Sequence, residues 1–579
     1  MSSRRLLLIV FLLPAMAFLA SCAKQGYPSG GPKDVDPPAV KGVTPPSGST
    51  AYSANRFRLD FNEYIDLKDA DNNILVSPPM NPKPEYTVKG KSLMVKFRDT
   101  LRPSTTYLFQ FSGAVVDYTE GNPLPSFEYV FSTGEAVDSL CLRGAVVDAL
   151  TLKPYSSPLT ILAYSPSPSD TLGDSLIAKV HPTYVTRTAA DGSFSLNYLA
   201  DNSYKIVAID DGDHNLRHSP SEAIAWLDTA VKAYPLPRPK QDTAKTADTT
   251  AVADSTVVAD TLAAAVEVPA VEPLRLLVSS SASSAVPQRI VSKTFSERGI
   301  ARVVTAAPLS NPQVVADSVM WQLNAKGDTL TLYTLRQTTD SLQVILLDSA
   351  TSLSDTLTLR YRESRHSRRN NSDTPELNRL TSRVSSTHPY FDSLTFAFAA
   401  PVSASSLSDI TILHLADSTS DTVYADILWP GTLARIVTNK PLQQGEKYRI
   451  TIPAGATRDI WRRANDSLVF TTTLTSEKDY GTISVSVNSS LQRPVLQLLN
   501  DKGEVVVEQV LAASSDKVTF PHLKPATYGL RLFDDRDGDG RWTPGDYYLH
   551  RHPEPVFYFG KALQLRENWE MEEDWKVEE

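Results

Sequence analysis

The sequence predicts an all-β protein that is built as a tandem array of β-sandwich domains. Short segments in which apolar and polar residues alternate, such as 57–61 and 107–111, recur between turns rich in Pro, Gly and Asn, a pattern typical of antiparallel sandwiches. The chain contains 40 Pro and 23 Tyr but only 6 Met, which favours β-domains with Pro-rich connections over helices. Its 579 residues are enough for several domains, each with its own core.

Residues 1–22 predict a signal peptide that ends in a lipidation site. Two arginines precede a mostly apolar stretch, residues 6–20, which is too short and wrongly flanked for a stable membrane span. Residues 19–22 read Leu-Ala-Ser-Cys, which resembles a bacterial lipobox, and this resemblance implies that Cys22 is lipidated and becomes the mature N-terminus. The alternative is an ordinary signal peptide with an accidental cysteine.

Lipid chains on Cys22 would hold the protein on a membrane without any hydrophobic helix. Cys141 is then the one other cysteine of the mature chain, so an internal disulfide is not expected. Removal of residues 1–21 takes away two arginines and no acidic residue, so the formal net charge changes from −9 to −11. An acidic chain has no electrostatic reason to bind nucleic acid.

Residues 23–37 predict a flexible tether that stiffens where prolines begin. The sequence Gly-Gly-Pro-Lys-Asp at residues 30–34 is followed by two prolines at 37 and 38. Together with the lipobox, this resembles a group of Bacteroidota envelope lipoproteins that carry a bacterial Ig-like domain of the S-layer type. The resemblance implies an outer-membrane lipoprotein with an Ig-like sandwich over residues 38–134.

Residues 138–230 resemble a second kind of sandwich, the transthyretin-like or carboxypeptidase-regulatory-like domain. The opening segment 144–148, the tight turn 190–194 and the strand 204–209 carry this resemblance.

The composition changes at residues 235–273, where Ala, Thr, Asp, Val and Pro predominate and large side chains are almost absent. Such a segment cannot bury enough apolar area to offset its ordering entropy, so a disordered linker is expected. Residues 274–362 return to strand patterns and predict a further β-domain, and the polar, Arg-rich residues 363–380 predict another linker.

The second half of the chain repeats the first at matching spacings. Leu442 and Tyr448 have the same separation as Leu101 and Tyr107, so residues 383–475 are expected to form a second, divergent Ig-like domain. Residues 476–560 are expected to form a second transthyretin-like domain, because the spacing from Leu523 to Tyr528 equals that from Leu199 to Tyr204.

Residues 561–579 form an acidic tail that contains two tryptophans. One interpretation is a last strand that pairs with the preceding domain and then frays. The other is a strand that binds a partner, because an exposed sheet edge can be completed by another chain.

The segment 535–546 has the spacing of a calcium loop. Side-chain oxygens occur at positions 1, 3, 5, 9 and 12, and Gly occupies position 6, where the chain must bend sharply. The predicted ligands are the carboxylates of Asp535, Asp537, Asp539 and Asp546 and the backbone carbonyl of Arg541. The alternative is a solvated acidic hairpin, and no organic cofactor is predicted.

Aligned on the repeat, residues 211–222 are an earlier copy of this loop. The weaker candidate ligands there are Asp211, Asp213, Asn215 and Glu222. Leu216 stands where the second copy has Gly, and a left-handed Leu is costly, so metal binding is less expected in the first loop.

No nucleophile elbow, metalloprotease helix, phosphate-binding Gly loop or dinucleotide fingerprint occurs in the sequence. Arrays of sandwiches provide reach and binding surface. The sequence therefore predicts a non-enzymatic, outer-membrane-anchored lipoprotein that acts as a multidomain envelope scaffold or protein-binding adaptor, with another envelope or outer-membrane protein as its partner.

Two alternatives remain open. One is an accessory lipoprotein subunit of an outer-membrane machine for β-barrel assembly or secretion. The other is a glycan-binding or adhesive surface protein, which would have an aromatic-lined cleft. The resemblance also bears on the membrane face, because surface lipoproteins of this group often carry acidic residues after the lipidated cysteine. Residues 23–25 read Ala-Lys-Gln, which favours the periplasmic face over the cell surface.

Overall fold

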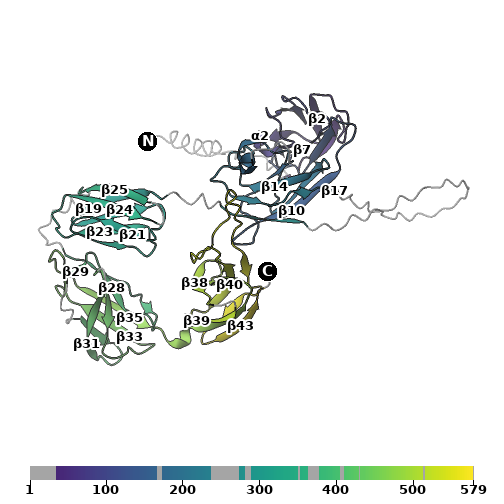
Figure 1. Cartoon of the computed structure of the whole chain (residues 1–579). Helices are drawn as coiled ribbons and strands as arrows, with labels where there is room; N and C mark the ends of the chain where they lie inside the picture. Colours follow the sequence, from purple (N-terminus) through teal and green to yellow (C-terminus); the bar gives the residue numbers. More distant parts are fainter. Residues whose placement is uncertain are drawn as a thin grey trace, which may run out of the picture. The chain divides into compact units, whose positions relative to one another are not determined.

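The computed structural model describes residues 34–111, 113–165, 173–236, 273–280, 288–349, 353–362, 377–403, 410–428, 431–512 and 515–577. β-Strands dominate these residues, and their helices are single turns (Figure 1), so the all-β prediction is confirmed. The chain forms two compact units, the first from most of residues 34–276 and the second from most of residues 277–577. Among the described residues, no helix has the length and apolar character needed to span a membrane.

The signal peptide, Cys22 and nearly all of the predicted tether lie outside the described residues. The same is true of residues 237–272 within the predicted linker 235–273, and of residues 363–376.

Domain 1, residues 40–132, is a sandwich with two main sheets and a small third one. Its first sheet has the order β1-β2-β6-β5, with β1 at Val40–Thr44, β2 at Arg56–Phe61, β5 at Glu85–Lys89 and β6 at Ser92–Lys96. The second has the order β4-β7-β9 and the third β3-β8. These strands are β3 Ile65–Leu67, β4 Leu75–Ser77, β7 Thr106–Gln110, β8 Val115–Asp117 and β9 Glu128–Ser132, and the short helix α2 is Ala70–Asn73.

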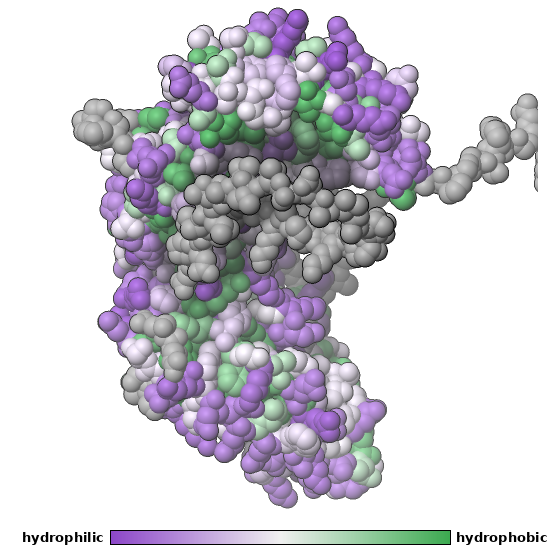
Figure 2. Space-filling model, turned by 90° about the vertical axis from the view of Figure 1, so that its right-hand side faces the viewer, coloured by the Kyte–Doolittle hydropathy of each residue, from purple (hydrophilic) through white to green (hydrophobic). Residues whose placement is uncertain are grey.

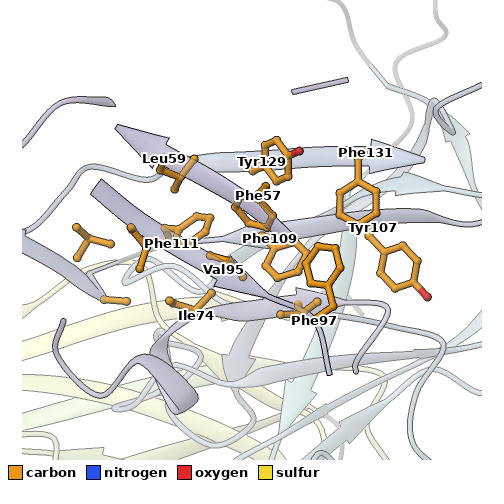
Figure 3. Close-up of a cluster of buried hydrophobic side chains, with 14 of the residues drawn as sticks. Phe57, Leu59, Ile74, Val95, Phe97, Tyr107, Phe109, Phe111, Tyr129 and Phe131 are labelled. Atoms are coloured by element: carbon orange, nitrogen blue, oxygen red, sulfur yellow. The ribbon is translucent and has the colours of Figure 1, made fainter. Parts of the chain in front are cut away.

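The core of domain 1 is aromatic. Alternation along β2 turns Phe57 inward, where its ring centroid lies 4.0 Å from that of Tyr129 and 5.0 Å from that of Phe109. Figure 3 shows these rings gathered between the strands. Phe131 joins them, with its ring 4.1 Å from that of Tyr52. Aromatic pairs at these distances add to the stabilisation that burial itself provides.

Domain 2 begins at residue 140 and has two sheets, of orders β13-β10-β17 and β12-β11-β14-β15. The strands are β10 Leu140–Asp148, β11 Thr160–Tyr164, β12 Tyr184–Arg187, β13 Ser193–Leu199, β14 Ser203–Ile209, β15 Ile224–Trp226, β16 Val231–Lys232 and β17 Tyr234–Pro235. The single turns η2, Gly173–Ser175, and α3, Leu176–Lys179, precede β12. Cys141 is a free, buried thiol in β10.

A strand from beyond the linker completes domain 2. Residues 274–278 were predicted to begin the third domain. They form β18, Leu274–Val278, which pairs with β10 of domain 2. The close approach depends on Gly144, because a Cβ there would lie 2.5 Å from the carbonyl oxygen of Leu274. The prediction that residue 274 opens the third domain is therefore wrong.

Domain 3, residues 290–360, is a sandwich with sheets β19-β20-β23-β22 and β21-β24-β25. Its strands are β19 Ile290–Glu297, β20 Ile300–Thr305, β21 Pro312–Val315, β22 Val319–Leu323, β23 Thr329–Thr334, β24 Ser341–Asp348 and β25 Leu353–Arg360.

Domain 4, residues 378–474, has a sheet of order β26-β28-β32-β31-β30-β33-β35-β27 and a small pair β29-β34. The strands are β26 Leu380–Ser382, β27 Thr387–His388, β28 Thr395–Phe398, β29 Val402–Ser403, β30 Ile410–His414, β31 Ser420–Leu428, β32 Leu433–Val437, β33 Lys447–Ile452, β34 Arg458–Asp459 and β35 Leu468–Leu474. The domain begins before residue 383, because Asn378 is buried and donates from Nδ2 to the carbonyl of Ala400.

Domain 5, residues 476–577, has sheets β39-β36-β43 and β38-β37-β40-β41, and β42 also pairs with β40. The strands are β36 Gly481–Asn488, β37 Pro494–Leu499, β38 Val505–Val510, β39 Ser515–Leu523, β40 Ala526–Asp534, β41 Val556–Tyr558, β42 Leu563–Leu565 and β43 Glu570–Lys576, and a single turn η5, Glu477–Asp479, precedes them.

The prediction that residues 561–579 form a separate acidic tail is wrong. β43 pairs in parallel with β36, and Trp575 lies in the core of domain 5. The alternating Met, Trp and Val side chains of the tail supply an inward face, so this segment is the last strand of the domain. Of the two interpretations, pairing with the preceding domain is the one that the structure confirms.

The repeat visible in the sequence is also a repeat of contacts. In domain 1 the Tyr107 hydroxyl accepts a hydrogen bond from Arg102 N at 2.9 Å, and in domain 4 that of Tyr448 accepts one from Gln443 N at the same distance. In domain 2 the Tyr204 hydroxyl donates to Ala200 O at 2.8 Å, and in domain 5 the Tyr528 hydroxyl donates to Lys524 O at 2.7 Å.

Candidate functional site

The strongest candidate site is the acidic loop between β40 and β41 of domain 5. Carboxylate oxygens of Asp535, Asp537 and Asp539 lie within 4.8 Å of one another. Asp535 is buried, whereas the other two are exposed. Three converging carboxylates repel one another unless water or a cation relieves the repulsion.

Asp535 organises this loop through both of its carboxylate oxygens. Oδ1 accepts hydrogen bonds from the N–H groups of Gly538 at 2.7 Å and Asp539 at 3.2 Å. Oδ2 accepts a hydrogen bond from Gly540 N at 3.0 Å. Gly540 has a φ of +75°, which Gly adopts without strain. The glycine at position 6 therefore makes the bend that the calcium-loop spacing requires.

The predicted ligand of position 12 makes other contacts. The carboxylate of Asp546 accepts hydrogen bonds from Tyr548 N at 3.0 Å and Leu549 N at 3.2 Å, so it caps the turn that follows the loop. Arg541 donates its backbone N–H to Asp539 Oδ1 at 2.7 Å. The structure thus brings together the ligands of positions 1, 3 and 5. The carboxylate of position 12 instead accepts hydrogen bonds from the backbone of the following turn.

Residues outside the predicted ligand set also hold the loop. Glu554 is buried, and its carboxylate accepts hydrogen bonds from Arg536 N at 2.6 Å and Thr543 N at 2.8 Å. Burial raises the pKa of Glu554, the two N–H bonds oppose this, and Asp537 adds to the rise. The Arg551 guanidinium lies 3.7 Å from Asp537 Oδ2. No spacing pattern in the sequence points to Glu554, because the return of the chain after the turn sets its position.

The earlier loop, residues 211–222 after β14, has the same backbone plan. Asp211 Oδ1 accepts from Asn215 N at 3.0 Å, and its Oδ2 accepts from Leu216 N at 3.1 Å. His214 and Leu216 have φ values of +57° and +59°, at the positions that Gly fills in the second loop. A left-handed Leu costs roughly 1–2 kcal/mol. The first loop therefore has the same turn as the second although Leu216 is unfavourable in it.

The first loop gathers a different carboxylate set. Oxygens of Asp211, Asp213 and Glu222 lie within 4.8 Å of one another, while Asn215 donates from Nδ2 to Asp213 Oδ2 at 2.7 Å. Burial raises the pKa of Asp211, its two backbone hydrogen bonds oppose the rise, and the charge of Asp213 adds to it. The carboxylate of position 12 therefore joins the group in the loop that lacks Gly.

Both donor sets consist of hard carboxylate oxygens, which fit calcium in kind but not yet in number, since calcium takes six to eight oxygens. Asp535, Asp537 and Asp539 would hold the ion in domain 5, with water or backbone carbonyls completing the shell. The ion would offset two of the three negative charges of these carboxylates and tie the loop to the end of β40.

Calcium is therefore expected to stabilise domain 5. At a free calcium concentration 100 times Kd the gain would be about 2.7 kcal/mol, and Asp537→Asn should reduce it, because the variant keeps an oxygen ligand but loses one ligand charge. Hydrogen–deuterium exchange of peptides from residues 526–558 of the full chain, with calcium and with chelator, measures the effect. Asp501→Asn, in an exposed turn of the same domain, is the matched control and should keep the gain. A wild-type chain that exchanges equally in calcium and in chelator would contradict the site.

A cleft of about 1130 Å³ lies in the first unit, beside the loop of domain 2. Domain 1 contributes Gln110 and Glu128 to its wall, and domain 2 contributes Arg143, Arg187 and Asp211. Gln110 Nε2 donates to Glu128 Oε1 at 3.1 Å. Burial lowers the pKa of Arg187, while Asp211 counters the shift. The sequence did not predict this cleft, because its wall comes from two domains.

The glycan-binding alternative expected aromatic rings along a cleft. Phe194 is the one aromatic side chain among the described residues that line this cleft, and it is almost fully buried in the core of domain 2. Sugar rings stack on exposed aromatic faces, so this cleft lacks the surface that the alternative called for.

Comparison with protein-family models identifies two segments of the chain. Residues 34–133 and 372–472 each match the bacterial Ig-like domain. The first match spans domain 1, and the second covers domain 4 as far as residue 472, within its last strand β35. A search of curated proteins found no match.

Several solved structures resemble the chain at low sequence identity. A titin fragment shares 10% identity over 42% of this chain and 90% of that one, with a TM-score of 0.14. The S-layer protein SbsC shares 11% over 92% and 67%, with a TM-score of 0.14. The Bacteroides ovatus mixed-linkage glucan utilization locus protein SGBP-B, solved with a mixed-linkage heptasaccharide, shares 9% over 66% and 87%, with a TM-score of 0.18.

Such low TM-scores give no information on function. The family matches do identify the domains, because they coincide with the two sandwiches whose strand order and tyrosine contacts repeat. The chain therefore contains two bacterial Ig-like domains, one in each half.

Proposed function

We propose that this protein is a membrane-anchored envelope lipoprotein that acts as a non-enzymatic scaffold or protein-binding adaptor. The observation that carries the proposal is the tandem arrangement of two Ig-like domains, each followed in the chain by a sandwich with an acidic loop. A repeated array of this kind presents extended surface, and the lipobox-like residues 19–22 supply the attachment to a membrane.

The surface supports a binding role. The face drawn in Figure 2 is mostly hydrophilic, with hydrophobic residues gathered in small patches. Non-obligate interfaces are about as apolar as the rest of a protein surface, so this face is compatible with a protein partner, and another envelope or outer-membrane protein is the partner that the anchor would bring within reach.

Membrane attachment can be tested through Cys22. The wild-type protein is expected in the membrane fraction and in the detergent phase of a two-phase extraction, whereas Cys22→Ser should leave the membrane fraction because it cannot take the lipid. Cys141→Ser, which removes the buried thiol, is the matched control and should stay with the membrane. A Cys22→Ser protein that fractionates like the wild type would contradict lipid anchoring.

The adaptor role is tested separately, by affinity purification from detergent-solubilised membranes with and without chelator. A stoichiometric envelope protein should co-purify with the wild type. Proteolysis of intact cells then distinguishes the two membrane faces, since a periplasmic protein survives it. Purification of the chain alone under mild detergent would contradict the adaptor role and leave the anchor unaffected.

A further inference from the structure

Large hydrophobic side chains are exposed at one end of domain 1. Of the residues that the structure describes up to the end of this domain, the large hydrophobic ones that stand exposed are Val35, Tyr64 and Tyr118, by 75%, 62% and 73%. Tyr118 N donates to Tyr64 O at 3.0 Å. Asn122, at the end of the same turn, donates from Nδ2 to the carbonyl of Asp34 at 3.1 Å, next to Val35. The three side chains therefore share one end of the domain, which we call the tyrosine face.

The internal repeat identifies the counterpart of the tyrosine face in domain 4. β3 pairs with β8 in domain 1 as β29 pairs with β34 in domain 4. At the end of the first pair Tyr118 N donates to Tyr64 O, and at the end of the second Ile460 N donates to the carbonyl of Pro401, also at 3.0 Å. Pro401 and Ile460 are therefore the counterparts of the two tyrosines. Pro401 is buried and Ile460 is half-buried, whereas both tyrosines are exposed.

In domain 4 this end packs against domain 3. Trp461 follows Ile460, and its Nε1 donates to the carbonyl of Thr334 at 2.8 Å. Gly299, with a φ of +83°, lies so close to the indole that a Cβ at this position would collide with the ring. Both Thr334 and Gly299 belong to domain 3. The second Ig-like domain thus uses this end to contact the domain that precedes it in the chain.

The first Ig-like domain has a different neighbour. In the part of the chain that the structure describes, no domain precedes domain 1. Residues 23–33 separate Cys22 from Asp34, and a chain of that length spans at most about 43 Å when fully extended. Because Asp34 lies at the tyrosine face, a lipid on Cys22 would keep this face close to the membrane surface.

We propose that the tyrosine face of domain 1 docks on the membrane, with Tyr64 and Tyr118 in the headgroup region of zwitterionic phospholipids. Tyrosine is enriched at membrane–water interfaces because its ring is apolar and its hydroxyl is polar. The docking rests on the proposed lipid anchor. Two rings alone bind a bilayer weakly, but the anchor makes the contact intramolecular and so raises the effective concentration of the membrane surface. The docking would fix the orientation of domain 1 on the membrane.

The charges around the tyrosine face decide the kind of lipid. The Lys91 ammonium lies 5.4 Å from the centroid of the Tyr64 ring, where it can meet a lipid phosphate. Ammonium groups do not outnumber carboxylates at this end, so anionic lipids gain no advantage there. The charged residues beside the face are Lys68, Lys91, Asp34, Asp36, Glu63 and Glu120.

An environment-sensitive fluorophore next to Tyr118 tests the docking in the full, lipidated chain. Thr119 is exposed, and a label on Thr119→Cys reports on the face without replacing either tyrosine. Cys141 is buried and Cys22 carries the lipid, so the introduced thiol is the one that reacts. On vesicles of phosphatidylethanolamine and phosphatidylcholine, the emission of this label should shift to the blue, and nitroxide-labelled lipids should quench it.

Thr100→Cys is the matched control. Thr100 is an exposed threonine of the same domain, and β6, which begins beside Lys91, leads away from the tyrosine face toward it. A label at position 100 should show neither the shift nor the quenching. Tyr64→Ser combined with Tyr118→Ser removes both rings without touching the core, and it should abolish the shift at position 119.

Flotation of the same vesicles separates this docking from the anchor on which it rests. A chain that does not float with the vesicles overturns both. A chain that floats, but whose label at position 119 behaves like the label at position 100, overturns the docking alone. A blue shift that persists in the double-serine variant also overturns it, and so does an envelope protein that is captured by a photo-crosslinker at position 119 in whole envelopes.

Discussion

Replacing Phe131 with alanine is expected to lower the unfolding free energy of domain 1 by about 3–5 kcal/mol. The side chain is fully buried, and its ring lies 4.1 Å from that of Tyr52, 5.4 Å from that of Tyr107 and 5.5 Å from that of Phe97. Its removal leaves a cavity whose aromatic walls cannot close without moving two sheets. The loss of apolar burial and the loss of contacts around the cavity therefore both lower the free energy of unfolding.

Hydrogen–deuterium exchange of the full chain localises this effect, because a chain of several domains does not unfold in one step. Peptides that cover β2, β7 and β9 should exchange faster in Phe131→Ala, while peptides of domain 5 should not change. Tyr118→Ala is the control, since Tyr118 lies in the same domain and is 73% exposed, so its truncation should cost little. Equal protection of domain 1 in the wild type and in Phe131→Ala would refute the core described for domain 1.

Much of the fold could be predicted because a strand with one buried face has apolar residues at every second position of its sequence. Residues 57–61 and 107–111 are strands that place alternate side chains in the core. The equal spacing of Leu and Tyr in the two halves has a physical reason. Each tyrosine hydroxyl forms a hydrogen bond with the backbone four or five residues upstream, and this bond fixes the number of residues in the turn before the tyrosine.

The errors of strand assignment share one cause. A strand pairs with whatever edge is available, and local sequence does not say which edge that is. β18 follows a long connection and still returns to β10, and β43 pairs in parallel with β36. Both segments alternate as strands should. Their membership of domains 2 and 5 depends on long-range pairing.

The acidic loops show the same limit at a finer scale. Positions 1, 3 and 5 converge in the loop of domain 5 because one turn of chain contains them. Position 12 lies beyond that turn, so the path of the following residues decides its direction. Asp546 caps its own turn, whereas Glu222 meets Asp211. Leu216 adopts the left-handed conformation that is costly for a leucine, and the N–H groups of Asn215 and Leu216 donate to Asp211 in that turn.

Trp575→Ala is expected to lower the unfolding free energy of domain 5 by about 3–5 kcal/mol, although the residue lies only four positions from the end of the chain. β43 pairs along β36 with Trp575 opposite Val487. The indole is 7% exposed and lies 5.5 Å from the ring of Phe559. Truncation would open the core at the edge where the last strand is held by one neighbour. That strand should then fray and expose β36.

The tail itself provides the control. Trp569 is 49% exposed, with the Arg566 guanidinium 5.0 Å above its ring, so Trp569→Ala removes the same side chain from the same segment without opening the core. Exchange of peptides from residues 481–488 should rise strongly in Trp575→Ala and little in Trp569→Ala. If the two variants behave alike, the tail is not part of the core, and its tryptophans would be free to bind a partner. A large difference between them makes the last strand a structural requirement of domain 5, because its loss would leave β36 as the edge of the sheet, and an unpaired edge is a template for pairing with another chain.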